Sequence, residues 1–131
     1  MERLKMELSQ LNNVSILDVG TGGGAFISLI TSIFDGYLSI VGVDTHERAI
    51  DAAKKTFAEN ERISFKKTDI LENDFGEATF DIICLSNSVH HLENIEEVMK
   101  EMIKLVKPNG FILVNEMISS DLNSMQKSHM Y

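Results

Sequence analysis

The sequence has few of the residues that build disulfide frameworks, and it has no apolar run of membrane-spanning length. Its 131 residues include one cysteine and one proline, and no apolar stretch approaches the roughly 18 residues that a spanning helix needs. Cys84 has no partner for an internal disulfide and lies in an apolar run, which indicates a buried core residue and a reducing compartment. Residues 1–6 lack the apolar core of a secretion signal. We therefore predict a cytoplasmic protein without a membrane segment.

Basic residues are also scarce. The chain carries 12 Lys and Arg against 20 Asp and Glu, a formal net charge of -8, and the basic residues are scattered along it. A nucleic-acid partner requires a basic surface, so this balance argues against nucleic acid and favours a small-molecule substrate. The sequence contains no recognisable Cys/His cluster with metal-ligand spacing and no recognisable Ser/His/Asp order. We predict no metal site.

The chain has the composition of one soluble globular domain. Hydrophobic residues make up 44% and charged residues 24%, and a chain of this length builds a single core. We predict one domain over residues 1–131. It consists of an amphipathic helix at 1–13, a core at 14–118 and the start of a C-terminal segment at 119–131.

Apolar strands alternate with helices along the core. We predict strands at 14–19, 37–43, 62–67, 80–86 and 111–117, helices at 25–34, 45–57 and 94–106, and mostly loop at 70–79. Thr45 is expected to cap the second of these helices. The alternation predicts an α/β fold, with a doubly wound parallel sheet and helices on both faces. In such a fold the ligand lies beyond the carboxyl ends of the strands.

Residues 16–24 read ILDVGTGGG, an apolar strand that ends in an acid and then a glycine turn that leads into a helix. Gly20, Gly22 and Gly24 allow a sharp turn and a close approach to a ligand, and the following helix directs free N–H groups at it. A dinucleotide would bring its pyrophosphate near the carboxylate of Asp18, whereas S-adenosylmethionine carries an ammonium and a sulfonium. The turn therefore favours S-adenosylmethionine.

Polar residues at the ends of the other strands extend this site. Asp44 follows the second strand, 24 residues after Gly20, where an acid can accept hydrogen bonds from both ribose hydroxyls. Asp69 and the pair Ser86 and Asn87 follow the third and fourth strands. Because these strand ends meet at one edge of a parallel sheet, their convergence predicts a nucleotide-cofactor site.

Over about residues 14–118 the chain resembles the class I S-adenosylmethionine-dependent methyltransferases. The matching segments are 17–24, 43–44, 68–70, 80–81, 90–92 and 105–110, in that order. The resemblance implies a Rossmann-like sheet of strand order 3-2-1-4-5 with S-adenosylmethionine as cofactor. The family's sheet usually continues into a final antiparallel hairpin, and this chain stops at Tyr131. We therefore expect a domain truncated at its C-terminus, without that hairpin.

The resemblance also implies a role for each matched residue. The glycine turn would hold the methionine portion, Asp18 would face its ammonium, and Asp44 would bind the ribose. Asp69 and the backbone of Ile70 would meet the adenine, and Ser86 would lie beside the sulfonium. The predicted cofactor-binding residues are Asp18, Gly20, Thr21, Gly22, Gly24, Asp44, Thr45, Asp69, Ile70, Ser86 and Asn87.

The predicted activity is methyl transfer from S-adenosylmethionine to an unidentified small molecule. The reaction is an in-line displacement, so it requires alignment rather than a catalytic nucleophile. His90 and His91, just after the fourth strand, are candidate general bases for an acceptor that loses a proton. Two alternatives stay open. The glycine turn also fits an NAD(P)-dependent oxidoreductase, and the early end of the chain fits a cofactor-binding fragment without turnover.

The expected strand order leaves the segment 111–117 at the edge of the sheet. This segment is apolar and free of proline, and Glu116 is its only acid. Unprotected edge strands pair with other chains. We expect self-association through this strand, or its coverage by the segment after Ser119.

Overall fold

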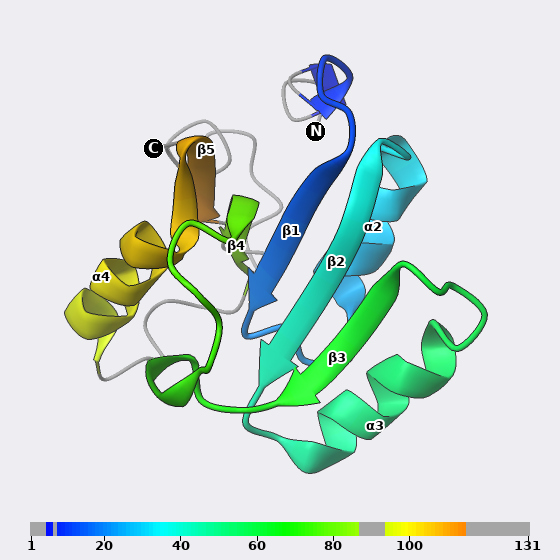
Figure 1. Cartoon of the computed structure of the whole chain (residues 1–131). Helices are drawn as coiled ribbons and strands as arrows, with labels where there is room; N and C mark the ends of the chain where they lie inside the picture. The colour runs from blue at the N-terminus through cyan, green and yellow to red at the C-terminus, as the bar shows by residue number, and fades with distance from the viewer. Residues whose placement is uncertain (1–4, 7, 87–93, 115–131) are drawn as a thin grey trace.

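The computed structural model describes residues 5–6, 8–86 and 94–114, which form a parallel sheet with helices packed against it (Figure 1). The strands are β1 (Val14–Val19), β2 (Tyr37–Asp44), β3 (Ile63–Lys67), β4 (Phe80–Leu85) and β5 (Val106–Val114). The helices are α2 (Ala25–Ile33), α3 (Glu47–Thr56), α4 (Ile95–Leu105) and the short 3-10 helix η1 (Ile70–Glu72). The described strands are ordered β3-β2-β1-β4-β5, and each neighbouring pair is parallel. The predicted Rossmann-like α/β fold and its strand order are confirmed.

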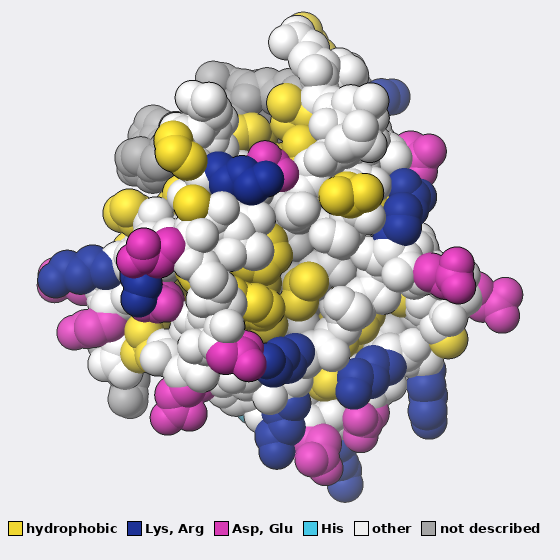
Figure 2. Space-filling view, in the orientation of Figure 1, with side chains coloured by type: hydrophobic (Ala, Val, Ile, Leu, Met, Phe, Trp, Pro, Cys, Tyr) yellow, Lys and Arg dark blue, Asp and Glu magenta, His cyan; other side chains and the backbone are white. Residues whose placement is uncertain are grey.

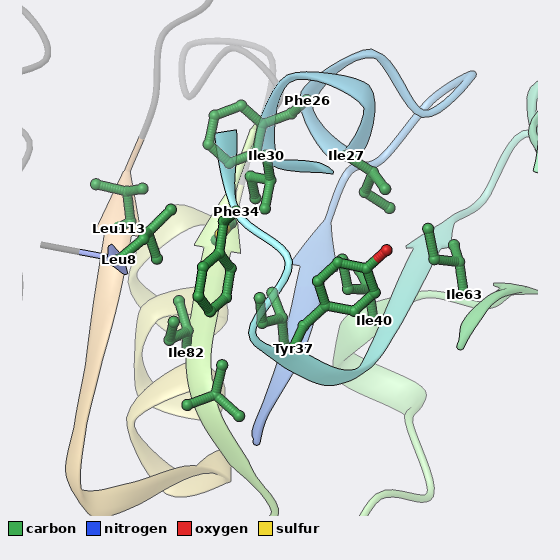
Figure 3. Close-up of a cluster of buried hydrophobic side chains, with 13 residues drawn as sticks. Leu8, Phe26, Ile27, Ile30, Phe34, Tyr37, Ile40, Ile63, Ile82 and Leu113 are labelled. Carbon is green, nitrogen blue, oxygen red and sulfur yellow. The ribbon is translucent and has the colours of Figure 1, made fainter. Parts of the chain in front are cut away.

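Two apolar cores lie on opposite faces of the sheet, because successive residues of a strand point to opposite sides. Ile16 of β1 packs with Phe26 and Ile30 of α2, in the cluster shown in Figure 3. The next residue, Leu17, belongs to the second cluster, which includes Met102 of α4. Both clusters draw on the central strands, so β1 and β4 are almost entirely buried. Cys84 lies fully buried in the first of these clusters, the α2-side cluster that contains Phe26 and Ile30, as predicted.

The predicted cap of the second helix is wrong. Helix α3 begins at Glu47, its N-cap is His46, and the side chain of that residue makes no capping hydrogen bond. The physical reason is the carboxylate of Asp44, which accepts from the backbone N–H of His46 at 2.9 Å. This bond forms a local turn after β2, so Thr45 lies in the turn instead of at the helix cap.

The last described strand begins earlier than predicted. Val106 pairs with Phe80 across a register shift, so β5 includes residues 106–110, which lie between the end of the predicted helix 94–106 and the start of the predicted strand 111–117. A Cβ at Gly110 would lie 2.2 Å from the carbonyl oxygen of Asp81. The absence of a side chain at Gly110 therefore allows β5 to approach β4 closely. Helix α4 continues directly into β5.

Shorter segments also differ from the prediction. Lys5, Met6 and Leu8 are helical, and Leu8 packs into the α2-side cluster, whereas residues 11–13 are not helical. Residues 70–72, expected in a loop, form η1 because the carboxylate of Asp69 accepts from the N–H of Leu71 at 2.9 Å. Among the described helices, none combines the length and the apolar character that crossing a bilayer requires.

The outer edge of β5 generates the first testable prediction. Within the described residues β5 is an edge strand, and we expect the chain to associate through it unless the segment after Ser119 covers it. Val114→Lys places a charge on this edge strand and is expected to convert the associated form to monomer in light scattering. Because Val114 is half-buried against the cluster that includes Met102, circular dichroism must first show that the variant is folded. Ile103→Lys is the control for an added surface charge, because Ile103 is apolar and 60% exposed and lies on α4. A wild-type monomer whose outward β5 amides exchange freely would contradict the prediction.

Candidate cofactor-binding site

Hydrogen bonds bring the glycine turn together with the ends of two other strands. The N–H groups of Gly20 and Thr21 both donate to the carbonyl of Val43 in β2, at 2.9 and 3.0 Å. The N–H of Ser86, just after β4, donates to the carbonyl of Val19 at 3.2 Å, and its hydroxyl donates to the carbonyl of Gly20 at 3.3 Å. In Figure 1 the arrowheads of β1, β2 and β3 also lie at one edge of the sheet. The carboxyl ends of β1, β2 and β4 therefore lie close together, as the sequence predicted.

The glycine turn has the conformation that the sequence indicates. Gly20, Gly22 and Gly24 have φ values of 75°, 56° and 91°, in the region that favours glycine. At Gly24 a Cβ would also lie 2.7 Å from the ring of Phe57. Gly24 is the N-cap of α2 and has no side chain to cap it, so the first N–H groups of the helix are left for a ligand.

Asp18 is buried without a hydrogen-bond partner. Its exposed fraction is 0%, and among the described residues nothing donates a hydrogen bond of good geometry to either carboxylate oxygen or to the hydroxyl of Thr21. The pKa of Asp18 is raised to about 7, because burial raises it strongly and the charge of Asp44 adds to this, whereas the hydroxyls of Ser86 and Thr21 lower it only in part. A buried charge without a partner is costly, so the site fits a ligand that carries a cation.

Asp44 links the glycine turn to the start of α3. Its side chain is 7% exposed. Oδ2 accepts from the N–H of Gly22 at 2.8 Å, and Oδ1 accepts from the backbone N–H of His46 at 2.9 Å. Nδ1 of the His46 ring lies 3.1 Å from the same Oδ1. His46 was not among the predicted site residues, although it lies two residues after the predicted ribose-binding acid.

The structure separates the remaining predicted residues into three groups. Asp69 is exposed and caps η1, next to the buried side chain of Ile70, and the N–H of Thr68 donates to the carbonyl of Asp44 at 2.9 Å. Thr45 is exposed in the turn before α3. Three predicted site residues lie outside the described residues: Asn87, His90 and His91. In the part of the chain that is described, no three His, Cys, Asp or Glu side chains gather as a metal site.

Comparison with known proteins identifies the family. Residues 17–114 match the model of the methyltransferase domain family. The chain belongs to the class I S-adenosylmethionine-dependent methyltransferases. The buried Asp18 beside a glycine turn fits the cofactor of this family, S-adenosylmethionine. The family match decides against the NAD(P)-dependent oxidoreductase alternative.

Several curated relatives carry methyltransferase names. The ubiquinone biosynthesis O-methyltransferase of Rickettsia bellii is 28% identical over 133 residues, which cover 99% of this chain and 51% of the relative. The sterol 24-C-methyltransferase of Debaryomyces hansenii is 30% identical over 120 residues, or 89% of this chain and 31% of the relative. The chain thus spans about half the length of the Rickettsia relatives.

Solved structures of low sequence identity share the fold. A putative S-adenosyl-L-methionine-dependent methyltransferase from Methanococcus maripaludis gives a TM-score of 0.76 at 22% identity, over 86% of this chain and 52% of the other. The trans-methyltransferase CalH, in complex with SAH, gives 0.74 at 23% identity, over 85% and 34%. The [4+2]-cyclase SpnF gives 0.75 at 21% identity, over 88% and 44%. The fold alone therefore does not determine the reaction.

The buried carboxyl of Asp18 generates a prediction about pH. Its pKa of about 7 lies above the ordinary 3.8, so the folded chain retains a proton that the unfolded chain loses between these values. The free energy of unfolding is therefore expected to fall as the pH rises from 4 to 7. Asp18→Asn removes this charge and should stabilise the fold at pH 8 by about 1–3 kcal/mol, with little gain at pH 4.

Thermal denaturation of wild type and variant between pH 4 and pH 8 measures this effect. Asp51→Asn is the matched control, because Asp51 is an exposed acid on α3. Its effect on stability is expected to be small and nearly independent of pH. An equal effect of Asp18→Asn at pH 4 and pH 8 would refute the assignment of a neutral buried carboxyl.

Proposed function

We propose that this domain binds S-adenosylmethionine at the ends of β1, β2 and β4 and transfers its methyl group to a small-molecule acceptor. The observation that carries the proposal is the buried Asp18 beside the glycine turn, which has no hydrogen-bond partner among the described residues. The ammonium and sulfonium of the cofactor compensate this carboxylate, whereas a pyrophosphate would add like charge to it.

Different residues of the site bind different parts of the cofactor. The N–H groups at the start of α2 bind the methionine carboxylate, and Asp18 compensates the ammonium. Asp44 accepts from the ribose hydroxyls, and Ile70 packs against the adenine, with Asp69 at its amino group. Ser86 lies beside the sulfonium. The bound cofactor supplies a methyl carbon that is already activated, so the protein's task is to align it with the acceptor.

We propose an oxygen acceptor on a small organic molecule. The Rickettsia O-methyltransferases support this choice, because their similarity extends over 99% or more of the chain, whereas that of the sterol C-methyltransferase covers 89%. A hydroxyl acceptor loses a proton on methylation, which gives His90 or His91 the role of general base. On the face shown in Figure 2, Lys and Arg side chains are interspersed with Asp and Glu, which does not favour a nucleic-acid acceptor. We place this reaction in the cytoplasm, consistent with the single buried thiol.

Ligand-induced stabilisation tests the choice of cofactor. S-adenosylmethionine at a hundredfold excess over its dissociation constant should stabilise the fold by about 2.7 kcal/mol, because it binds only the folded state. NAD should not stabilise it. A thermal-shift titration with both ligands measures this difference, and release of S-adenosylhomocysteine in the presence of hydroxyl-bearing acceptors measures turnover. Stabilisation by NAD alone would overturn the proposal.

Substitution of Asp44 tests its assignment to the ribose. Asp44→Ala removes a charged acceptor and should weaken binding of S-adenosylhomocysteine by about 1.5–3 kcal/mol, whereas Asp44→Asn should lose less. Calorimetry gives both affinities. Because Asp44 also binds two backbone N–H groups, circular dichroism must first show that each variant is folded. Asp51→Ala on the surface of α3 is the control, and unchanged affinity in folded Asp44→Ala would disprove the assignment.

A further inference from the structure

The carboxylate of Asp44 is almost fully used before any ligand binds. A carboxylate offers about four acceptor positions, two on each oxygen. Oδ1 accepts from the backbone N–H of His46 at 2.9 Å and contacts Nδ1 of the same residue at 3.1 Å. Oδ2 accepts from the N–H of Gly22 at 2.8 Å. One position therefore remains, on Oδ2, whereas a ribose diol brings two hydroxyl donors.

The three existing donors differ in how firmly they are held. The N–H of Gly22 belongs to the turn that two backbone bonds to Val43 fix, and the N–H of His46 belongs to the first turn of α3, whose Ile50 N–H donates to the carbonyl of His46 at 3.1 Å. The imidazole is different. It is 83% exposed and does not cap α3. Rotation about its side-chain bonds is enough to release it into water.

Among the described residues, no charged side chain other than Asp44 pairs with the imidazole. Lys67 at the end of β3 pairs with Glu47 at 3.5 Å, and both side chains are more than half exposed. Asp44 is the charged partner that the structure gives to the His46 ring. Displacing this ring from Asp44 therefore sacrifices one hydrogen bond at the surface and leaves the fold of the turn intact.

We propose that His46 is a specificity-determining residue of the cofactor site. Its imidazole occupies the acceptor position on Asp44 that the second ribose hydroxyl needs, and it leaves this position when both hydroxyls bind. The proposal rests on the proposed assignment of Asp44 to the ribose. His46 thus sets how strongly the site prefers ribose to deoxyribose.

The imidazole of His46 is therefore expected to reduce the preference of the site for ribose over deoxyribose. In the wild-type protein, a cofactor analogue with one hydroxyl uses the position that is already free, whereas the diol must exchange one hydrogen bond for another. Without the imidazole, both positions are open and the second hydroxyl adds its full contribution. The second hydroxyl's hydrogen bond, net of the water that it replaces, corresponds to about a two- to tenfold change in affinity.

Calorimetry with S-adenosylhomocysteine and its 2′-deoxy analogue tests the proposal. His46→Ala and His46→Phe, the second of which keeps a ring without a donor, are both expected to bind S-adenosylhomocysteine about two- to tenfold more tightly than wild type. The ratio of the two dissociation constants, deoxy over ribo, should rise by a similar factor. Glu47→Gln, a neighbouring exposed control, should leave the ratio unchanged.

The possible results separate this proposal from the function on which it rests. If wild type fails to bind S-adenosylhomocysteine, the proposed function fails. If Asp44→Ala binds normally, the ribose assignment fails. If both hold, weaker binding by the two folded His46 variants, or a ratio equal to that of wild type, overturns the role of His46. In an Asp44→Ala background, His46→Phe should have no effect on the ratio.

Discussion

The hydrogen bonds between the glycine turn and the end of β2 are the interaction on which the site depends. Three consecutive N–H groups, from Gly20 to Gly22, donate to the carbonyl of Val43 and the carboxylate of Asp44. They fix the turn against a strand that is itself paired on both sides. The direction of α2 and the position of its free N–H groups follow from this attachment. Because α2 then packs on the sheet through Phe26 and Ile30, the site and the α2-side core are built on the same bonds.

The parallel sheet explains why residues far apart in the sequence share one site. All described strands run in the same direction, so the residues that follow β1, β2 and β4 meet at one edge. The two ends of each strand therefore have different roles, one structural and one in the candidate site. At the opposite ends, contacts such as the ring of Tyr37 beneath the guanidinium of Arg62, at 4.0 Å, hold the strands together. At the carboxyl ends, polar residues such as Asp18 and Asp44 face the candidate ligand site.

The sequence was sufficient to predict the fold and the cofactor of the family, for a physical reason. Strand period, helix period and glycine turns are local properties, so alternation predicted the layers and motif order predicted the cofactor. One error arose where a contact distant in sequence decides the local structure. Val106 becomes strand because it pairs with Phe80, which no local pattern of residues 106–110 reveals. The error at the start of α3 is local, because the carboxylate of Asp44 accepts from the backbone N–H of His46, only two residues later.

Two features of the site depend on tertiary packing and side-chain conformation, which the sequence pattern does not reveal. An acid after an apolar run is ordinarily solvated, and only the packed structure shows that Asp18 is enclosed and has no partner among the described residues. The involvement of His46 likewise depends on a side-chain rotamer. Asp18 has fewer hydrogen-bond partners than its carboxylate can accept, whereas most acceptor positions of Asp44 are already occupied. Such polar groups indicate a ligand more directly than the glycine motif does.

The two acids of the site oppose each other before a ligand arrives. Asp18 lies on β1 directly beside Gly42 of β2, two residues before Asp44, and burial together with the charge of Asp44 raises the pKa of Asp18. A cation beside Asp18 favours its ionised form, whereas hydroxyl donors stabilise the charge of Asp44. The two carboxylates on adjacent strands therefore favour a single ligand that carries a cation near Asp18 and hydroxyl donors near Asp44.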